Sequence, residues 1–174
     1  DKNNNSNSDG GGKKDLIKGG IACGAALFAA ISFQQVGLLY TTAGKAGFIT
    51  ALYILLVPVF GLFLHKKVKK SVWAGISLAV VGLYLLCVNE GFSISKGDFI
   101  VLCGTVFWAL HILIIDHFAG KADNLKMSFL QFAIAGTISL IVAIFAETIV
   151  FWDIVKSAGP ILFTGIFVAG LAYT

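Results

Sequence analysis

A few polar side chains lie inside long apolar stretches, and these are the residues that could do chemistry. Thr105, Trp108 and His111 follow one another at intervals of three, so they share one face of a helix. His111 is the titratable group deepest in an apolar stretch, with an ordinary pKa of about 6.5. It could contact a solute or sense protons, and it could equally form a hydrogen bond between helices. Trp108 lies too far from either end of its stretch for an interfacial role, which leaves cavity lining or packing.

Other candidates are hydroxyls and amides. Thr50 and Tyr53 share a helix face by their spacing, although each hydroxyl could bond to its own helix. Gln34 and Gln35 are adjacent amides that cannot both face lipid cheaply. Amides donate and accept hydrogen bonds, which suits zwitterionic solutes and also suits contacts between helices. The candidate solute-binding residues are therefore Trp108, His111, Thr50, Tyr53, Gln34, Gln35 and Gln131.

Catalytic and metal-binding signatures do not occur in the chain. It contains no HExxH, no GxSxG and no paired CxxC, so a nucleophile or ligand set of those kinds is not visible. Asp116 and His117 stand at the end of an apolar stretch, off the face that carries His111. They leave open a membrane enzyme acting on lipid, but no partner motif supports it. We expect no enzymatic activity, no catalytic residue, no metal and no cofactor.

Long apolar helices must position these side chains. Hydrophobic residues make up 57% of the 174 residues and charged residues 13%, and the mean hydropathy is +0.89. A water-soluble core cannot absorb that much apolar surface. About 20 apolar residues cross a bilayer as a helix, which satisfies its own backbone groups. The sequence predicts an all-α, polytopic bundle of six membrane-spanning helices, at 19–40, 46–64, 72–88, 99–115, 127–146 and from 157 to the end.

Small residues and one proline predict how these helices pack and bend. Gly20 and Gly24 lie four apart, a spacing that lets helices approach closely in lipid. The pair Gly75 and Gly82 suggests a second close contact. Pro58 cannot donate a backbone hydrogen bond to the Ile54 carbonyl, so it predicts a kink near that residue.

The positive charge indicates orientation and not nucleic-acid binding. The net charge is +4, but the lysines lie in short loops and not on a folded basic face. Basic loops remain in the cytoplasm, so we expect a multi-pass protein of the cytoplasmic membrane with its first residue inside. The lysine-rich loops contain Lys2, Lys13, Lys14, Lys18, Lys66, Lys67, Lys69, Lys70, Lys121 and Lys126, and the alternate loops contain Lys45, Lys96 and Lys156.

The polar segments between spans predict the remaining organisation. Residues 1–18 begin with a polar, glycine-rich tract and are expected to form a flexible cytoplasmic loop or tail. Residues 91–97 are expected to form an extracytoplasmic linker. The chain begins at Asp1 and ends at Thr174 inside an apolar run, so we expect it to be a fragment of a longer protein.

Two long blocks carry a family resemblance. GLLYTTAGKAGFITALYILLVPVFGLFL, followed by a basic loop and WAGISLAVVGLYLL, resembles the first repeat of the EamA-like drug/metabolite transporter superfamily. KGDFIVLCGTVFWALHILIIDHFAG, followed by LQFAIAGTISLI, resembles the opening of the second repeat. The resemblance implies ten helices in two inverted five-helix repeats. The chain would then supply the third to eighth helices, with residues 19–90 ending the first repeat and 98–174 starting the second.

The same resemblance implies a function. Such proteins are secondary transporters that move amino acids or similar small metabolites by alternating access, with no shared solute signature. The alternative is a structural or assembly subunit whose polar groups only join helices. The expected partners are a small-molecule solute and membrane lipid, with no nucleic acid. Glycine-rich faces suit contacts within a chain and between chains equally, so a homodimer is also compatible with the sequence.

Overall fold

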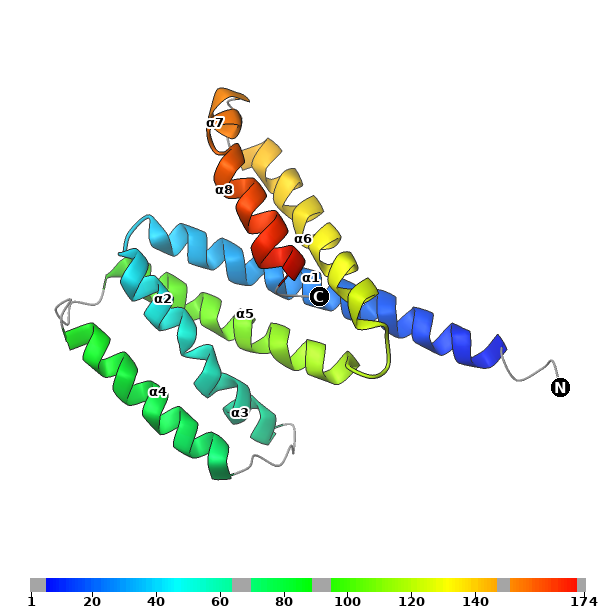
Figure 1. Ribbon diagram of the computed structural model, residues 1–174, viewed down its shortest axis with the longest axis horizontal. Helices are drawn as coiled ribbons and strands as arrows, with labels where there is room; N and C mark the ends of the chain where they lie inside the picture. Colours follow the sequence, from blue (N-terminus) through cyan, green and yellow to red (C-terminus); the bar gives the residue numbers. More distant parts are fainter. Residues whose placement is uncertain (1–5, 64–69, 89–94, 147–150, 172–174) are drawn as a thin grey trace. The chain divides into compact units, whose positions relative to one another are not determined.

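The computed structural model describes residues 6–63, 70–88, 95–146 and 151–171, and these residues are almost entirely helical (Figure 1). The expected all-α class is confirmed. The helices are α1 (Ser6–Leu38), α2 (Ala43–Ala51), α3 (Tyr53–Phe63), α4 (Lys70–Val88), α5 (Lys96–Phe118), α6 (Asn124–Ala146), α7 (Phe151–Lys156) and α8 (Ala158–Phe163), followed by a π-helical segment, η1 (Thr164–Leu171).

Four helical stretches are long and apolar enough to cross a membrane. They are Gly12–Leu38, Ala43–Phe63, Lys96–Phe118 and Asn124–Ala146. The other two expected crossings coincide with shorter apolar helices, Ser71–Gly82 and Ala158–Phe167. The described helices therefore have the character of a polytopic membrane bundle.

The chain forms two compact units, and α1 contributes to both. One unit contains residues 1–25 and 118–174, and the other contains residues 26–117. In the first unit, α1 packs on α6 through small residues. A Cβ atom on Gly20 would lie 2.4 Å from Leu130 Cδ2, and one on Gly24 would lie 2.8 Å from Ile134 Cβ. The close helix contact predicted from Gly20 and Gly24 is confirmed.

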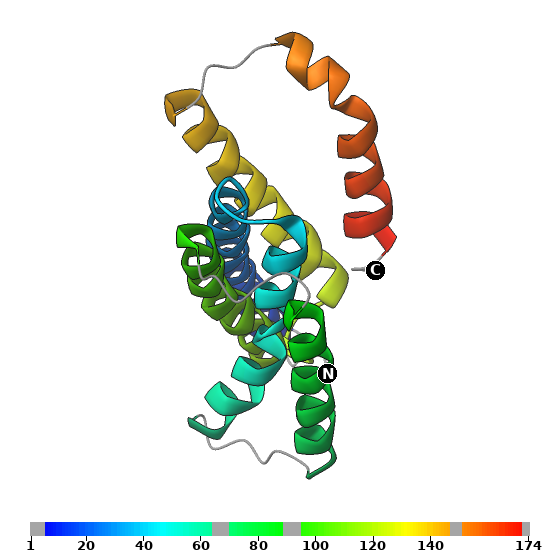
Figure 2. The same cartoon turned by 90° about the vertical axis from the view of Figure 1, so that its left-hand side faces the viewer.

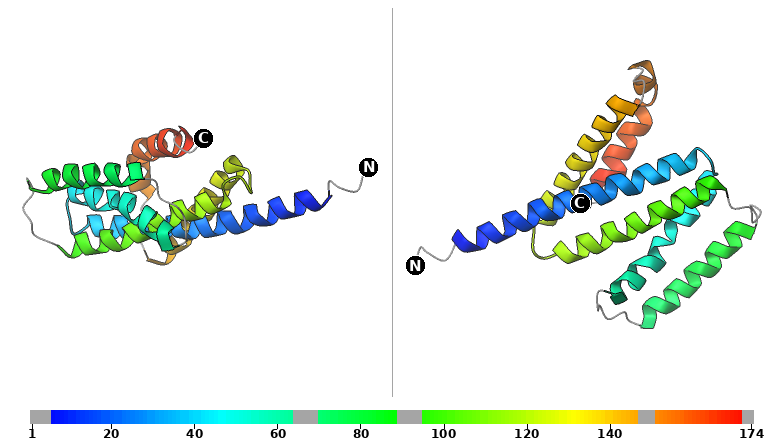
Figure 3. Two further views of the ribbon diagram at one scale, coloured as in Figure 1. Left: turned by 90° about the horizontal axis from the view of Figure 1, so that it is seen from below. Right: turned by 180° about the vertical axis from the view of Figure 1, so that it is seen from behind.

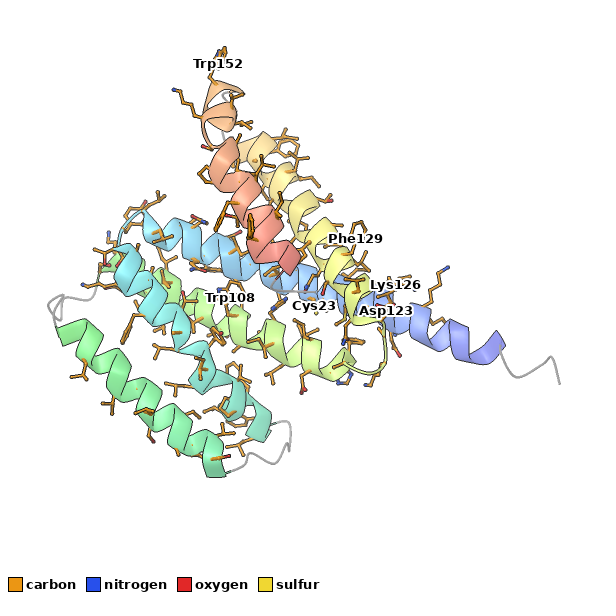
Figure 4. All side chains as sticks on the ribbon, viewed as in Figure 1. Cys23, Trp108, Asp123, Lys126, Phe129 and Trp152 are labelled. Atoms are coloured by element: carbon orange, nitrogen blue, oxygen red, sulfur yellow. The ribbon has the colours of Figure 1, made fainter. Side chains whose placement is uncertain are left out.

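An aspartate fixes the start of α6 in this unit. The backbone N–H groups of Leu125 and Lys126 donate to Asp123 Oδ1 over 3.0 and 3.2 Å, as in an N-cap. The Lys126 ammonium lies 3.7 Å from Asp123 Oδ2 (Figure 4). The backbone donor of Lys126, followed by its positive charge, holds the pKa of the Asp123 carboxyl below its ordinary value.

In the second unit, α1 and α5 run side by side and approach closely at glycines (Figures 1 and 3). A Cβ atom on Gly97 would lie 2.5 Å from the Gly37 carbonyl oxygen, and one on Gly104 would lie 2.9 Å from Phe33 Cβ. The Phe33 ring stacks on Phe107 with centroids 5.4 Å apart. In the same unit, α4 lies beside α2 (Figures 1 and 2).

Two expectations need correction. Helix α1 begins at Ser6, although residues 1–18 were expected to be a flexible tail. Gly19 and Gly20 are buried, so packing fixes the helix at this point. Once a helix is formed, each further residue adds one backbone hydrogen bond, and α1 can therefore extend toward its N-terminus. The close contact predicted at Gly75 and Gly82 is not formed with any described residue, because a Cβ atom on either would meet no described atom within 4 Å.

The second span bends slightly earlier than expected. Helices α2 and α3 form one span, interrupted at Leu52, two residues before Ile54. The Leu52 N–H donates to the Ile49 carbonyl over 3.1 Å, and the Leu55 N–H donates to the Leu52 carbonyl over 2.9 Å. These three-residue bonds tighten the turn. Pro58 lies within α3, so the irregularity is in the turns before the proline.

Some expectations fall on residues outside the described ranges. Residues 1–5 of the expected tail and 91–94 of the expected linker are among them, as are Lys2, Lys66, Lys67 and Lys69. The orientation of the chain in the membrane therefore remains a prediction from the lysine pattern.

Candidate functional site

Three of the predicted residues meet between α1 and α5. Trp108 Nε1 donates to Gln34 Oε1 over 3.2 Å, and the His111 ring meets the Trp108 ring edge-on, with centroids 6.1 Å apart. Figure 4 marks Trp108 on α5. His111 is 2% exposed. Gln34, Trp108 and His111 thus form a continuous polar strip within the second unit.

Thr105 lies on the same face of α5 as Trp108 and His111, and its side chain contacts α2. The Thr105 hydroxyl is completely buried and donates to the Ile49 carbonyl over 3.1 Å and to the Val101 carbonyl over 3.0 Å. Thr50 follows Ile49 in the chain, and its hydroxyl oxygen is buried without a hydrogen-bond partner among the described residues. Tyr53 begins α3 and is half-buried. The tightened turn around Leu52 therefore carries Thr50 and Tyr53.

The two remaining candidates are Gln35 and Gln131. Gln35 is exposed and Gln34 bonds to Trp108, in keeping with the expectation that the two adjacent amides do not both face lipid. Gln131 is 2% exposed, but it belongs to α6 in the other compact unit. Its burial fits an inward-facing amide.

The sequence reasoning missed a polar cluster around Asp98. The Asp98 carboxylate is 7% exposed and accepts hydrogen bonds from the Thr41 hydroxyl and, over 2.7 Å, from the Ser95 N–H. The Ser95 hydroxyl in turn accepts from the Asp98 N–H over 3.1 Å. This is a reciprocal capping box at the start of α5. The spacing of Ser95 and Asp98 could have revealed the box, whereas Thr41 is 57 residues from Asp98.

A shallow open pocket of about 400 Å³ lies at the turn between α1 and α2, beside this cluster. None of the seven candidate residues lines it. Lys45 lies at the pocket, and its backbone N–H donates to the Thr42 hydroxyl over 3.2 Å. The pocket is lined by Leu39, Tyr40, Thr41, Thr42, Lys45 and Ser95.

Charged side chains in the second unit lie at the ends of the spans. The segments 46–63 and 99–115 contain no aspartate, glutamate, lysine or arginine. Within the described ranges, no three histidine, cysteine, aspartate or glutamate side chains gather to hold a metal ion. The strip can therefore offer hydrogen bonds and aromatic surface, with His111 as its titratable group.

The fold and these buried groups define a class, an all-α multi-pass membrane protein with polar side chains turned inward from apolar helices. Residues 5–88 match the EamA-like transporter family. A protein of Archaeoglobus fulgidus named as an uncharacterized transporter is 37% identical over 134 residues, which are 76% of this chain and 42% of that protein. Both matches support an EamA-like transporter. No solved structure matches it significantly.

Proposed function

We propose that the whole protein is a secondary transporter that moves amino acids or similar small metabolites across the cytoplasmic membrane by alternating access. The match of residues 5–88 to the EamA-like transporter family and the similarity to a protein named as a transporter support transport. The chain spans less than half the length of that relative, so the proposal concerns the complete protein. In this proposal the protein performs no covalent chemistry and needs no cofactor.

The observation that carries the proposal is the strip of Gln34, Trp108 and His111. Polar side chains inside a membrane are costly and usually serve a function. The amide, indole and imidazole together supply donors, acceptors and a flat apolar surface. A small polar metabolite needs that combination to leave water. In inverted-repeat transporters, solute sites lie near the middle of the membrane where the repeats meet.

The remaining candidates extend the proposed site. Thr50 and Tyr53 would contact the solute from the tightened turn of the second span, and Gln35 and Gln131 would supply further amides. The lysine-rich loops would face the cytoplasm together with the first residue. Lipid would cover the apolar outer faces, and a homodimer is compatible with the glycine-rich helices.

Replacing both Trp108 and His111 with alanine should lower the initial rate of solute uptake into vesicles about tenfold or more. Removing a buried hydrogen-bond partner costs about 1–3 kcal/mol, and about 1.4 kcal/mol corresponds to a factor of ten. The measurement is uptake of radiolabelled amino acids at equal amounts of protein in the membrane.

A matched control replaces a tryptophan and a histidine on exposed positions. Trp152 and His117 are both exposed, so their double alanine variant should transport at the normal rate. Unchanged uptake by the Trp108 and His111 variant would remove these two residues from the solute site.

A further inference from the structure

The Thr50 hydroxyl, in the second span, is a buried polar group that forms no hydrogen bond with the described residues. Thr50 lies about 10 Å along the helix from Ala43 at 1.5 Å per residue, well inside the apolar segment 46–63. A buried hydroxyl without a partner is unfavourable, and in a native structure it calls for a specific explanation.

Other threonines in the helices take a different hydrogen bond. Thr105 donates to the Val101 carbonyl over 3.0 Å, Thr137 to the Ala133 carbonyl over 2.7 Å, and Thr164 to the Pro160 carbonyl over 2.9 Å. Each bond joins a hydroxyl to the carbonyl four residues earlier, which is the usual solution for threonine in a helix. Thr50 does not form this bond, so the hydrogen-bonding capacity of its buried hydroxyl is unused by the described residues.

The turn that carries Thr50 is fixed from outside its own helix. The Ile49 carbonyl, one residue before Thr50, accepts from the Thr105 hydroxyl over 3.1 Å and from the Leu52 N–H over 3.1 Å. The first bond ties the turn to α5 and the second tightens it. Figure 1 shows this point as the junction of α2 and α3.

We propose that the Thr50 hydroxyl binds an uncharged polar group of the transported solute, an amide or a hydroxyl, and that Thr105 is the positioning residue that presents it. This inference rests on the proposed transport function and adds the chemistry of the group recognised at Thr50. In this proposal, the hydrogen bond that Thr50 does not form within the protein contributes to the affinity for the solute. The hydrogen bond from Thr105 to the Ile49 carbonyl fixes the position of the turn that carries Thr50.

The charge distribution around Thr50 argues for an uncharged group. The segments 46–63 and 99–115 carry no acidic or basic side chain other than His111, and His111 already meets Trp108. A single hydroxyl cannot compensate a charge in apolar surroundings. A neutral amide or hydroxyl needs only the one hydrogen bond that Thr50 offers.

The first test measures the stability of the solute-free protein. Thr50→Val keeps the side-chain shape and removes the hydroxyl, so the apparent Tm of the complete protein in detergent should rise by about 2 to 4 °C. The matched variant Thr137→Val, which loses a satisfied hydroxyl on an exposed position, should not raise it. A lower Tm for Thr50→Val would show that the hydroxyl has a partner without solute, and would overturn the inference whatever the transport result.

The second test measures transport in proteoliposomes with glutamine, serine and valine as probes. The three amino acids share their charged groups and differ in whether the side chain offers an uncharged polar group. Thr50→Val should raise KM about tenfold for glutamine or serine, the loss of one hydrogen bond, and leave KM for valine unchanged. Thr50→Ser should restore the wild-type values.

The outcomes distinguish a failure of the proposed role of Thr50 from a failure of the proposed transport function. Equal KM values for wild type and Thr50→Val, or an equal increase for all three probes, would overturn the role of Thr50 and leave transport standing. Absence of uptake by the wild-type protein would instead remove the proposed function. For the positioning role, Thr105→Val should raise KM selectively for glutamine or serine, Thr105→Ser should restore it, and adding Thr105→Val to Thr50→Val should raise KM no further.

Discussion

Replacing Gly97 with alanine is expected to destabilise the protein by about 3 kcal/mol, at the upper end for an overpacked site. The new Cβ atom would lie 2.5 Å from the Gly37 carbonyl oxygen, 2.7 Å from the Tyr40 carbonyl carbon and 2.8 Å from the Thr41 nitrogen. All three are backbone atoms, so no side chain can rotate to make room. Helix α5 would have to move away from the end of α1. The measurement is the apparent Tm of the purified protein in detergent.

Gly75 provides the matched control for this prediction. It lies within α4, and a Cβ atom on it would meet no described atom within 4 Å. Alanine is favoured over glycine inside a helix by about 1 kcal/mol, so Gly75→Ala should leave the Tm unchanged or raise it slightly. Equal Tm values for the two alanine variants would contradict the close approach of α1 and α5.

The second large effect is expected from Asp98→Ala, which should destabilise the protein by about 3 kcal/mol. The change removes the acceptor of both the Thr41 hydroxyl and the Ser95 N–H. It therefore leaves two part-buried donors unpaired at the start of α5. Asp98→Asn keeps one carbonyl acceptor and should be intermediate. Chemical or thermal unfolding of the detergent-solubilised protein would measure the difference.

Asp123 is the control, because it caps α6 through two backbone donors in an exposed position. Water can replace the lost acceptor there, so Asp123→Ala should lower the Tm clearly less than Asp98→Ala does. An equal loss from both variants would mean that the burial of Asp98 and its bond to Thr41 contribute nothing to stability.

Hydropathy predicted the helices well, because lipid imposes both the length and the helical form of each span. The expected span 46–64 appears as Ala43–Phe63, and 127–146 appears within Asn124–Ala146. The spacing of Gly20 and Gly24 also predicted a close contact correctly. The pattern of Gly75 and Gly82 has no close partner among the described residues, since small residues permit a contact without supplying the partner.

The candidate site was only partly accessible to sequence reasoning. Helical spacing correctly placed Thr105, Trp108 and His111 on one face, and the structure turns that face inward. Spacing could not identify Gln34 as the partner of Trp108, because the two residues are 74 apart in the chain. The bond between Thr41 and Asp98 was invisible for the same reason. Local patterns set helix faces, and tertiary packing decides which faces meet.

The most direct test of the central claim is counterflow into proteoliposomes containing the complete protein. Vesicles preloaded with one unlabelled amino acid or nucleobase receive the same solute in radiolabelled form outside, and protein-free vesicles serve as the reference. An alternating-access transporter predicts saturable uptake that the internal solute accelerates for at least one member of the panel. Uptake equal to that of protein-free vesicles for every member of the panel would contradict the account.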